Sequence, residues 1–232
     1  MKKIMQISVV VVLTTLVVGC IDTSSNNNVV QKKKQLVVLL YDISGSTDHH
    51  SFLMEQDLTT LFKKVSDIGG GSLSGYHIKK NSLQQDPYRV AIDALDTLSY
   101  KDNLFLDDEI QNSNRKTITT FDQHFKEMVD DALAKFVKPK NESYTDVENA
   151  LKLAKVDFEQ PSFSKYAKTL IIISDLIEDL PSKRAESKNT FTVEYENDIK
   201  IILVRPSLSH VECIKGQQPI IVNTMADAIN NL

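Results

Sequence analysis

Three short, mostly apolar runs constrain the fold of this 232-residue chain most strongly. They cover residues 36–41, 169–174 and 199–204, and they are rich in Val, Ile and Leu. Continuous apolar runs of this length are typical of parallel strands that are covered on both faces. The chain is therefore expected to contain a largely buried, parallel sheet.

Helical patterns lie between these runs. Apolar residues recur at three- and four-residue spacing, which places them along one side of a helix. The three stripes are Met54, Leu58, Leu61, Phe62 and Val65; Phe121, Phe125, Met128, Val129, Ala132, Leu133 and Phe136; and Val147, Ala150, Leu151, Ala154 and Phe158. Thr120 with Gln123, and Thr145 with Glu148, fit the capping-box pattern, so helices are expected to begin there. Alternating strands and helices predict the α/β class, with a doubly wound, mostly parallel central sheet and helices on both faces.

Residues 69–96 interrupt this alternation. Two extended segments, residues 72–78 and 88–94, flank a polar turn. This pattern predicts an antiparallel hairpin at one edge of the sheet. Residues 98–116 are polar and acidic and are expected to form an insertion, and residues 220–222 are expected to form a last edge strand before a short C-terminal helix.

The N-terminus carries the pattern of a secretory signal. Lys2 and Lys3 precede a mostly apolar stretch, residues 4–18, and Gly19 precedes Cys20. The apolar stretch is shorter than the about 20 residues that a membrane-spanning helix needs. The sequence Leu-Val-Val-Gly-Cys that ends at Cys20 resembles the bacterial lipobox, which implies cleavage before this cysteine and lipid attachment to its thiol. The alternatives are an ordinary signal peptide with a chance cysteine, or an uncleaved anchor.

The expected organisation is then a lipoprotein signal peptide at residues 1–19, a lipidated cysteine with a flexible tether at 20–35, and one domain at 36–232. The tether is rich in Ser, Asn, Lys and Gln, a composition that buries too little surface to fold. A lipid anchor predicts a location on the cell membrane or the outer membrane, facing the periplasm or the exterior. Ile21 stands where an inner-membrane retention signal would have Asp, which favours the outer membrane if the cell has two membranes.

Charge and cysteine content exclude some classes of function. The formal charge is −4, and it becomes −6 when Lys2 and Lys3 leave with the signal. Nucleic acid is therefore not an expected partner, because phosphate binding needs a surplus of Lys and Arg. Only two cysteines are present. If Cys20 is lipidated, Cys213 has no disulfide partner in the chain.

Oxygen-bearing side chains follow two of the apolar runs. Asp42, Ser44 and Ser46 alternate after the first run, Asp175 follows the second, and Thr145 lies at the expected start of a helix. Doubly wound sheets bind ligands at the carboxyl ends of their strands, so neighbouring strands would bring these groups into one crevice. Oxygen donors without sulfur or imidazole favour Mg²⁺, Mn²⁺ or Ca²⁺ over zinc. An open coordination position on such an ion would attract a carboxylate from another protein.

These five residues, in this order and in these contexts, resemble the von Willebrand factor type A (VWA) domain with its metal-ion-dependent adhesion site. The resemblance covers the whole expected domain. It implies that Ser44, Ser46 and Thr145 are direct metal ligands. It also implies that Asp42 and Asp175 act through water or as hydrogen-bond acceptors. The implied partner is a protein that offers an acidic residue to the metal.

Each part of this pattern also has a simpler explanation. Asp-x-Ser-Gly-Ser alone is typical of a turn, Thr145 alone fits a helix N-cap, and Asp175 alone fits the cap of a following helix. Leu176 follows Asp175 where the VWA family commonly has Gly. The simpler explanations require all three parts to meet in one crevice by chance.

Other motifs are weaker. His49 and His50 are adjacent, and adjacent residues rarely face one ion, so solvent-facing histidines are expected. The spacing of Gly70 and Gly75 imitates a phosphate-binding loop, but Tyr76 stands where that loop requires Lys. The run Asp-Asp-Glu at residues 107–109 is expected to be a solvated charge cluster.

The sequence thus predicts a membrane-tethered binding module and not an enzyme, because it offers no activated nucleophile and no general base beside the metal. One alternative is a scaffold with a non-functional metal site that binds through its insertions. Another is a magnesium-dependent phosphatase of the haloacid-dehalogenase type with Asp42 as nucleophile. That chemistry needs an acid two residues later, and Ser44 stands there.

Overall fold

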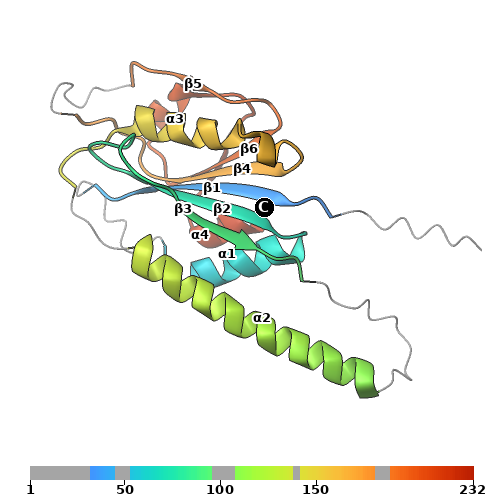
Figure 1. Ribbon diagram of the computed structural model, residues 1–232. Coiled ribbons are helices and arrows are strands. Elements are labelled where there is room, and N and C mark those ends of the chain that lie inside the picture. Colours follow the sequence, from blue (N-terminus) through green and yellow to red (C-terminus); the bar gives the residue numbers. More distant parts are fainter. Residues whose placement is uncertain (1–31, 45–52, 96–107, 138–141, 181–188) are drawn as a thin grey trace, which may run out of the picture. The chain divides into compact units, whose positions relative to one another are not determined.

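Six strands form the central sheet (Figure 1). They are β1 (Gln35–Asp42), β2 (Gly71–Ile78), β3 (Tyr88–Ile92), β4 (Ala167–Ile173), β6 (Ile199–Val204) and β8 (Ile220–Val222). The computed structural model describes residues 32–44, 53–95, 108–137, 142–180 and 189–232. The strand order is β3-β2-β1-β4-β6-β8, and every neighbouring pair is parallel except β2 with β3.

The predicted strands are confirmed. The three apolar runs are β1, β4 and β6, which lie next to one another in the middle of the sheet. The expected hairpin is formed by β2 and β3, and it places one antiparallel strand at an edge. The last predicted strand, β8, lies at the opposite edge beside β6.

Helices cover both faces of the sheet, as predicted (Figure 1). The helix α3 (Val147–Phe158) packs on one face, and the helices α1 (Glu55–Asp67), α2 (Asp108–Lys135) and α4 (Met225–Asn230) pack on the other. Side chains of β1 alternate between the two cores. Val37, Leu39 and Tyr41 contact the cluster of α1, α2 and α4, whereas Leu36, Val38 and Leu40 contact the cluster of α3. The chain therefore has a doubly wound α/β fold.

Smaller elements complete the α3 face. A two-stranded parallel sheet is formed by β5 (Val193–Glu194) and β7 (Ile214–Lys215). Two 3₁₀ helices are also present: η2 (Pro161–Phe163) precedes β4, and η3 (Leu208–Cys213) directly precedes β7. Side chains in or next to these segments, among them Tyr195 and Cys213, extend the buried cluster around α3.

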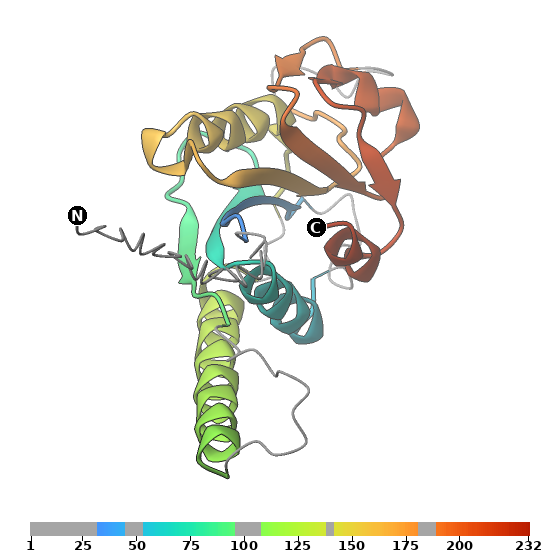
Figure 2. The same cartoon turned by 90° about the vertical axis from the view of Figure 1, so that its right-hand side faces the viewer.

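Helix α2 differs from the prediction. Residues 108–116 were expected to belong to an insertion, but they form the first turns of a 28-residue helix. Thr120 therefore does not begin a helix; its hydroxyl donates to the carbonyl of Lys116 within α2. Figure 2 shows the N-terminal part of α2 reaching beyond α1. The prediction failed because most described side chains between residues 112 and 120 are exposed, so this part carries no apolar stripe.

The expected signal peptide and the lipidation site Cys20 lie outside the described residues. The folded unit begins at Lys32, a few residues before the expected boundary. The carbonyl of Lys34 already accepts a hydrogen bond from the amide of Ala167 at the start of β4. Among the helices of the described ranges, none combines the length and the apolar character needed to cross a membrane.

Candidate metal centre

Asp42 ends β1 and is fully buried. Its Oδ1 accepts a hydrogen bond from the amide of Ser44 at 2.9 Å, and its Oδ2 accepts one from the hydroxyl of Ser174 at 2.7 Å. Burial raises the pKa of the Asp42 carboxyl, while the hydrogen bonds from Ser174 and from the amide and hydroxyl of Ser44 act in the opposite direction. The carboxylate is thus fixed in place at the carboxyl end of the sheet.

Backbone pairing joins the three predicted segments of the site. Ser44 forms a parallel bridge with Glu142, whose amide donates to the carbonyl of Ile43. Thr145 forms an antiparallel bridge with Asp179, and their amides donate to each other's carbonyls at 2.7 and 3.0 Å. The end of β1, the segment before α3 and the loop after β4 therefore lie side by side.

Thr145 is buried but does not cap α3. The N-cap is Asp146, whose side chain accepts a hydrogen bond from the amide of Asn149 at 3.3 Å. The predicted capping box of Thr145 with Glu148 is therefore wrong by one residue at its start. Asp146 also accepts a hydrogen bond from Ser82, at its backbone carbonyl, which ties the β2–β3 connection to the start of α3.

Asp175 follows β4 closely, as predicted from its position after the second apolar run. Its Oδ1 accepts a hydrogen bond from the amide of Ile177 at 3.0 Å, and its carbonyl accepts one from Ser207. The next residue, Leu176, is fully buried and has a φ of 65°, in the left-handed region. The position that is commonly Gly in the VWA family thus adopts a glycine-like backbone here with a leucine side chain.

Four of the five predicted donors lie in these paired segments: Asp42, Ser44, Thr145 and Asp175. Ser46 lies outside the described residues, as do His49, His50 and Asp107. Within the described ranges, no three His, Cys, Asp or Glu side chains gather into a metal-binding group. The expected donor set contains only two carboxylates, and its hydroxyl and carboxylate oxygens suit a hard divalent cation.

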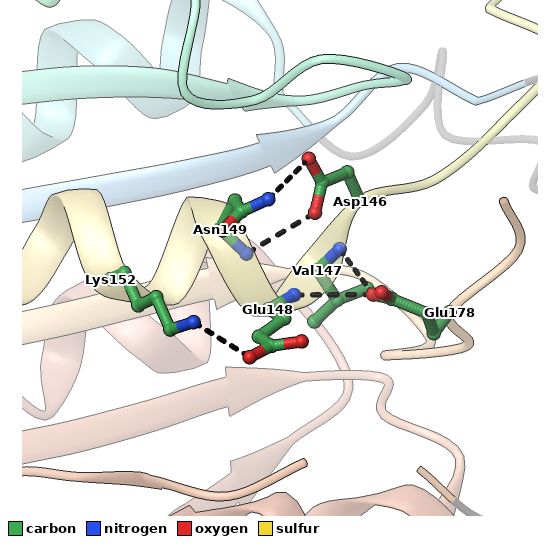
Figure 3. A network of polar contacts seen from close by, with 6 residues as sticks. All are labelled: Asp146, Val147, Glu148, Asn149, Lys152 and Glu178. Atoms are coloured by element: carbon green, nitrogen blue, oxygen red, sulfur yellow. Dashed lines mark hydrogen bonds and ion pairs between the residues drawn. The ribbon is translucent and has the colours of Figure 1, made fainter. Parts of the chain in front are cut away.

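Two polar residues of this region were missed by the sequence analysis. Ser174 is the polar end of the second apolar run, which marks it as a residue at a strand end, as Asp42 is, but does not show that the two strands are neighbours. Glu178 gives no such signal. Its Oε2 accepts hydrogen bonds from the amides of Val147 at 2.8 Å and Glu148 at 3.2 Å, and Figure 3 shows it facing the first turn of α3.

Similarity to known proteins is found for the structure of this chain and not for its sequence. No family model matches the chain, and no curated protein matches it. Similar solved structures include the pilus adhesin SpaC of Lactobacillus rhamnosus GG in an open conformation, with 13% identity, a TM-score of 0.33, and coverage of 63% of this chain and 15% of that chain. The manganese-loaded TRAP protein of Plasmodium vivax has 12% identity and a TM-score of 0.33, with coverage of 74% and 57%.

A third similar structure is the SpRpn10 VWA domain, with 10% identity, a TM-score of 0.33, and coverage of 85% of this chain and 95% of that chain. The chain spans less than two thirds of the adhesin and of the TRAP protein. VWA proteins are thus among the structures to which this chain is distantly similar, and at these identities the similarity assigns neither a family nor a function to it.

Proposed function

We propose that this protein is a divalent-metal-dependent protein-binding module, held at a membrane by a lipid on Cys20, and that it is not an enzyme. The observation that carries the proposal is the convergence of Asp42, Ser44, Thr145 and Asp175 on adjoining backbone segments at the carboxyl ends of β1 and β4. Mg²⁺ is the proposed ion, with Mn²⁺ or Ca²⁺ as substitutes.

The donor set explains why a partner is needed. Ser44 and Thr145 would offer neutral hydroxyls, with Ser46 as a third, and Asp42 and Asp175 would offer the only carboxylates. When bound, the metal would supply a charge of +2, and if Asp42 and Asp175 act through water, their two negative charges would lie at a distance and neutralise it incompletely. A Glu or Asp side chain of a partner protein would then complete the coordination and fix the partner's position.

The phosphatase alternative is disfavoured by the surroundings of Asp42. A nucleophilic carboxylate needs an oxygen that can approach the phosphorus atom. Asp42 is fully buried, and each of its oxygens accepts a hydrogen bond. Ser44 also stands where the acid of that mechanism is required.

Thermal unfolding of the full chain tests the metal site. The metal-stripped protein is compared with and without millimolar Mg²⁺ or Mn²⁺, beside Asp42→Asn. A metal that binds only the folded state raises stability by about 2.7 kcal/mol at 100 times its dissociation constant. We expect this rise in the wild type and its loss in Asp42→Asn. The unfolding transition of the metal-free variant shows whether it folds, because the Asn side chain has one acceptor oxygen where Asp42 accepts hydrogen bonds at both of its oxygens.

The matched control is Asp122→Asn, which removes an exposed carboxylate that pairs with Lys63 on the surface. This variant is expected to keep the full response to metal. An equal response in Asp42→Asn, or no response in the wild type, would contradict the proposed site. Partner binding that survives Asp42→Asn would instead support the scaffold alternative.

A further inference from the structure

Glu178 connects the loop after β4 to the start of α3. It is 92% buried, and one of its oxygens accepts hydrogen bonds from two successive backbone amides, those of Val147 and Glu148 (Figure 3). These are the first two residues of the helix. A carboxylate at this position also interacts favourably with the positive end of the helix dipole.

The four amides at the start of α3 all have acceptors, and two acidic side chains accept three of them. A helix leaves its first four amides without partners inside the helix. Here these are the amides of residues 146–149: Glu178 accepts those of Val147 and Glu148, the side chain of Asp146 accepts that of Asn149, and the carbonyl of Lys79 accepts that of Asp146. Asp146 is a local cap, whereas Glu178 comes from 31 residues away and so ties two separate segments together.

The segment that carries Glu178 also carries one candidate metal ligand and contacts another. Asp175 lies three residues before it, and Asp179, directly after it, pairs through its backbone with Thr145. Thr145 is therefore held from both sides: by Asp179 at its own amide and carbonyl, and by Glu178 at the helix turn that follows it.

We propose that Glu178 is a positioning residue for the candidate metal centre. By holding the first turn of α3 against the β4 loop, it sets the position of Thr145 relative to Asp175. This inference rests on the proposed function for its metal part. The first amides of α3 already have acceptors within the chain. A partner's carboxylate would therefore bind to the metal and not to the helix N-terminus.

The test uses the full chain with Glu178→Ala and Glu178→Gln. The matched control is Glu148→Ala, which removes from the same helix turn a carboxylate that pairs with Lys152 across the helix surface (Figure 3). Hydrogen exchange of the Thr145 and Asp179 amides is measured without metal. Mn²⁺ affinity is measured from the electron paramagnetic resonance signal of the free ion.

We expect exchange at these two amides to be at least tenfold faster in Glu178→Ala and unchanged in Glu148→Ala. Mn²⁺ affinity should fall by about 10- to 100-fold in Glu178→Ala, the usual effect of losing a group that orients metal ligands. Glu178→Gln keeps an acceptor oxygen without the charge, so we expect an intermediate loss. It also provides a readout if Glu178→Ala does not fold.

The outcomes separate the two proposals. Unchanged Mn²⁺ affinity in both Glu178 variants would overturn the positioning role, even if their metal-free stability falls. If the wild type binds no Mn²⁺, the proposed function fails. The hydrogen-exchange rates of the Thr145 and Asp179 amides then still test whether Glu178 holds Thr145 in place. Exchange equal to that of Glu148→Ala would then overturn this role of Glu178 as well.

Discussion

The hydroxyl of Ser174 donates a hydrogen bond to Oδ2 of Asp42 at 2.7 Å, and it thereby joins the carboxyl ends of β4 and β1. Both side chains are buried, and 132 residues separate them in the sequence. The same Ser174 oxygen accepts a hydrogen bond from the amide of Leu176. One hydroxyl therefore fixes both a candidate metal ligand and the turn that follows Asp175.

Ser174→Ala is expected to lower the free energy of unfolding by about 1–3 kcal/mol, because it removes the hydrogen bond to Oδ2 of the buried Asp42 carboxylate and the acceptor of the Leu176 amide. Urea unfolding of the metal-free protein measures this loss. Ser164→Ala, which removes an exposed hydroxyl before β4, is the control and should change stability by less than about 0.5 kcal/mol. Equal stability of the two variants would show that the Ser174 contact is unimportant for folding.

Leu176 combines an unfavourable backbone with a buried side chain, so two substitutions separate the two effects. A left-handed backbone costs a residue with a side chain about 1–2 kcal/mol, whereas deleting a buried leucine side chain costs about 2–5 kcal/mol. Leu176→Gly should therefore destabilise the protein, but less than Leu176→Ala does. This order is the reverse of that at ordinary positions. An alanine variant more stable than the glycine variant, measured by urea unfolding, would argue against the left-handed backbone.

Gly75 is required by the ring of Phe136. A Cβ atom at this position would lie 2.8–3.0 Å from three ring atoms. The ring has little freedom to move, because it is buried and stacks on His77 at 4.9 Å and Tyr88 at 6.0 Å. Gly75→Ala is expected to cost about 1–3 kcal/mol, as overpacking usually does.

A smaller residue at position 136 should relieve this clash. The double variant Gly75→Ala with Phe136→Leu is therefore expected to lose less stability than the sum of the two single variants. A double-mutant cycle with urea unfolding measures the coupling. Strict additivity would mean that the added methyl group does not meet the Phe136 ring.

Alkaline pH should destabilise the core on the α3 face. Burial raises the pKa of the Cys213 thiol and of the Tyr195 hydroxyl, which donates to the carbonyl of Leu151 at 2.7 Å. The folded protein therefore keeps protons that the unfolded chain loses at about pH 8.5 for Cys and about pH 10 for Tyr. The stability that these groups contribute is present below those values and is lost as pH rises towards the folded pKa values.

The free energy of unfolding is therefore expected to fall between pH 8 and pH 10.5. The variant with Cys213→Ala and Tyr195→Phe should show a smaller fall over this range, whatever its stability at pH 7. Urea unfolding at several pH values measures both slopes. Identical slopes would show that these two groups do not ionise differently in the folded and unfolded states.

Much of the fold was predictable because its signals are local. β1, β4 and β6 are continuous apolar runs, and α1 and α3 carry apolar stripes whose period needs no tertiary information. The start of α2 was not predictable in this way. The described side chains between residues 112 and 120 are mostly exposed and form no apolar stripe, so no amphipathic pattern marks this part as helical.

The candidate site, too, was predictable only in its local features. The sequence by itself determined which residues carry oxygen donors and that Asp42 and Asp175 follow buried strands, because strand ends and polar loop residues are visible in the order of residues. Only the tertiary structure decided that β1 and β4 are neighbours, that Ser174 contacts Asp42, and that Glu178 holds the first turn of α3. These contacts join residues far apart in the chain, and their partners are chosen by strand order and packing, which no local pattern encodes.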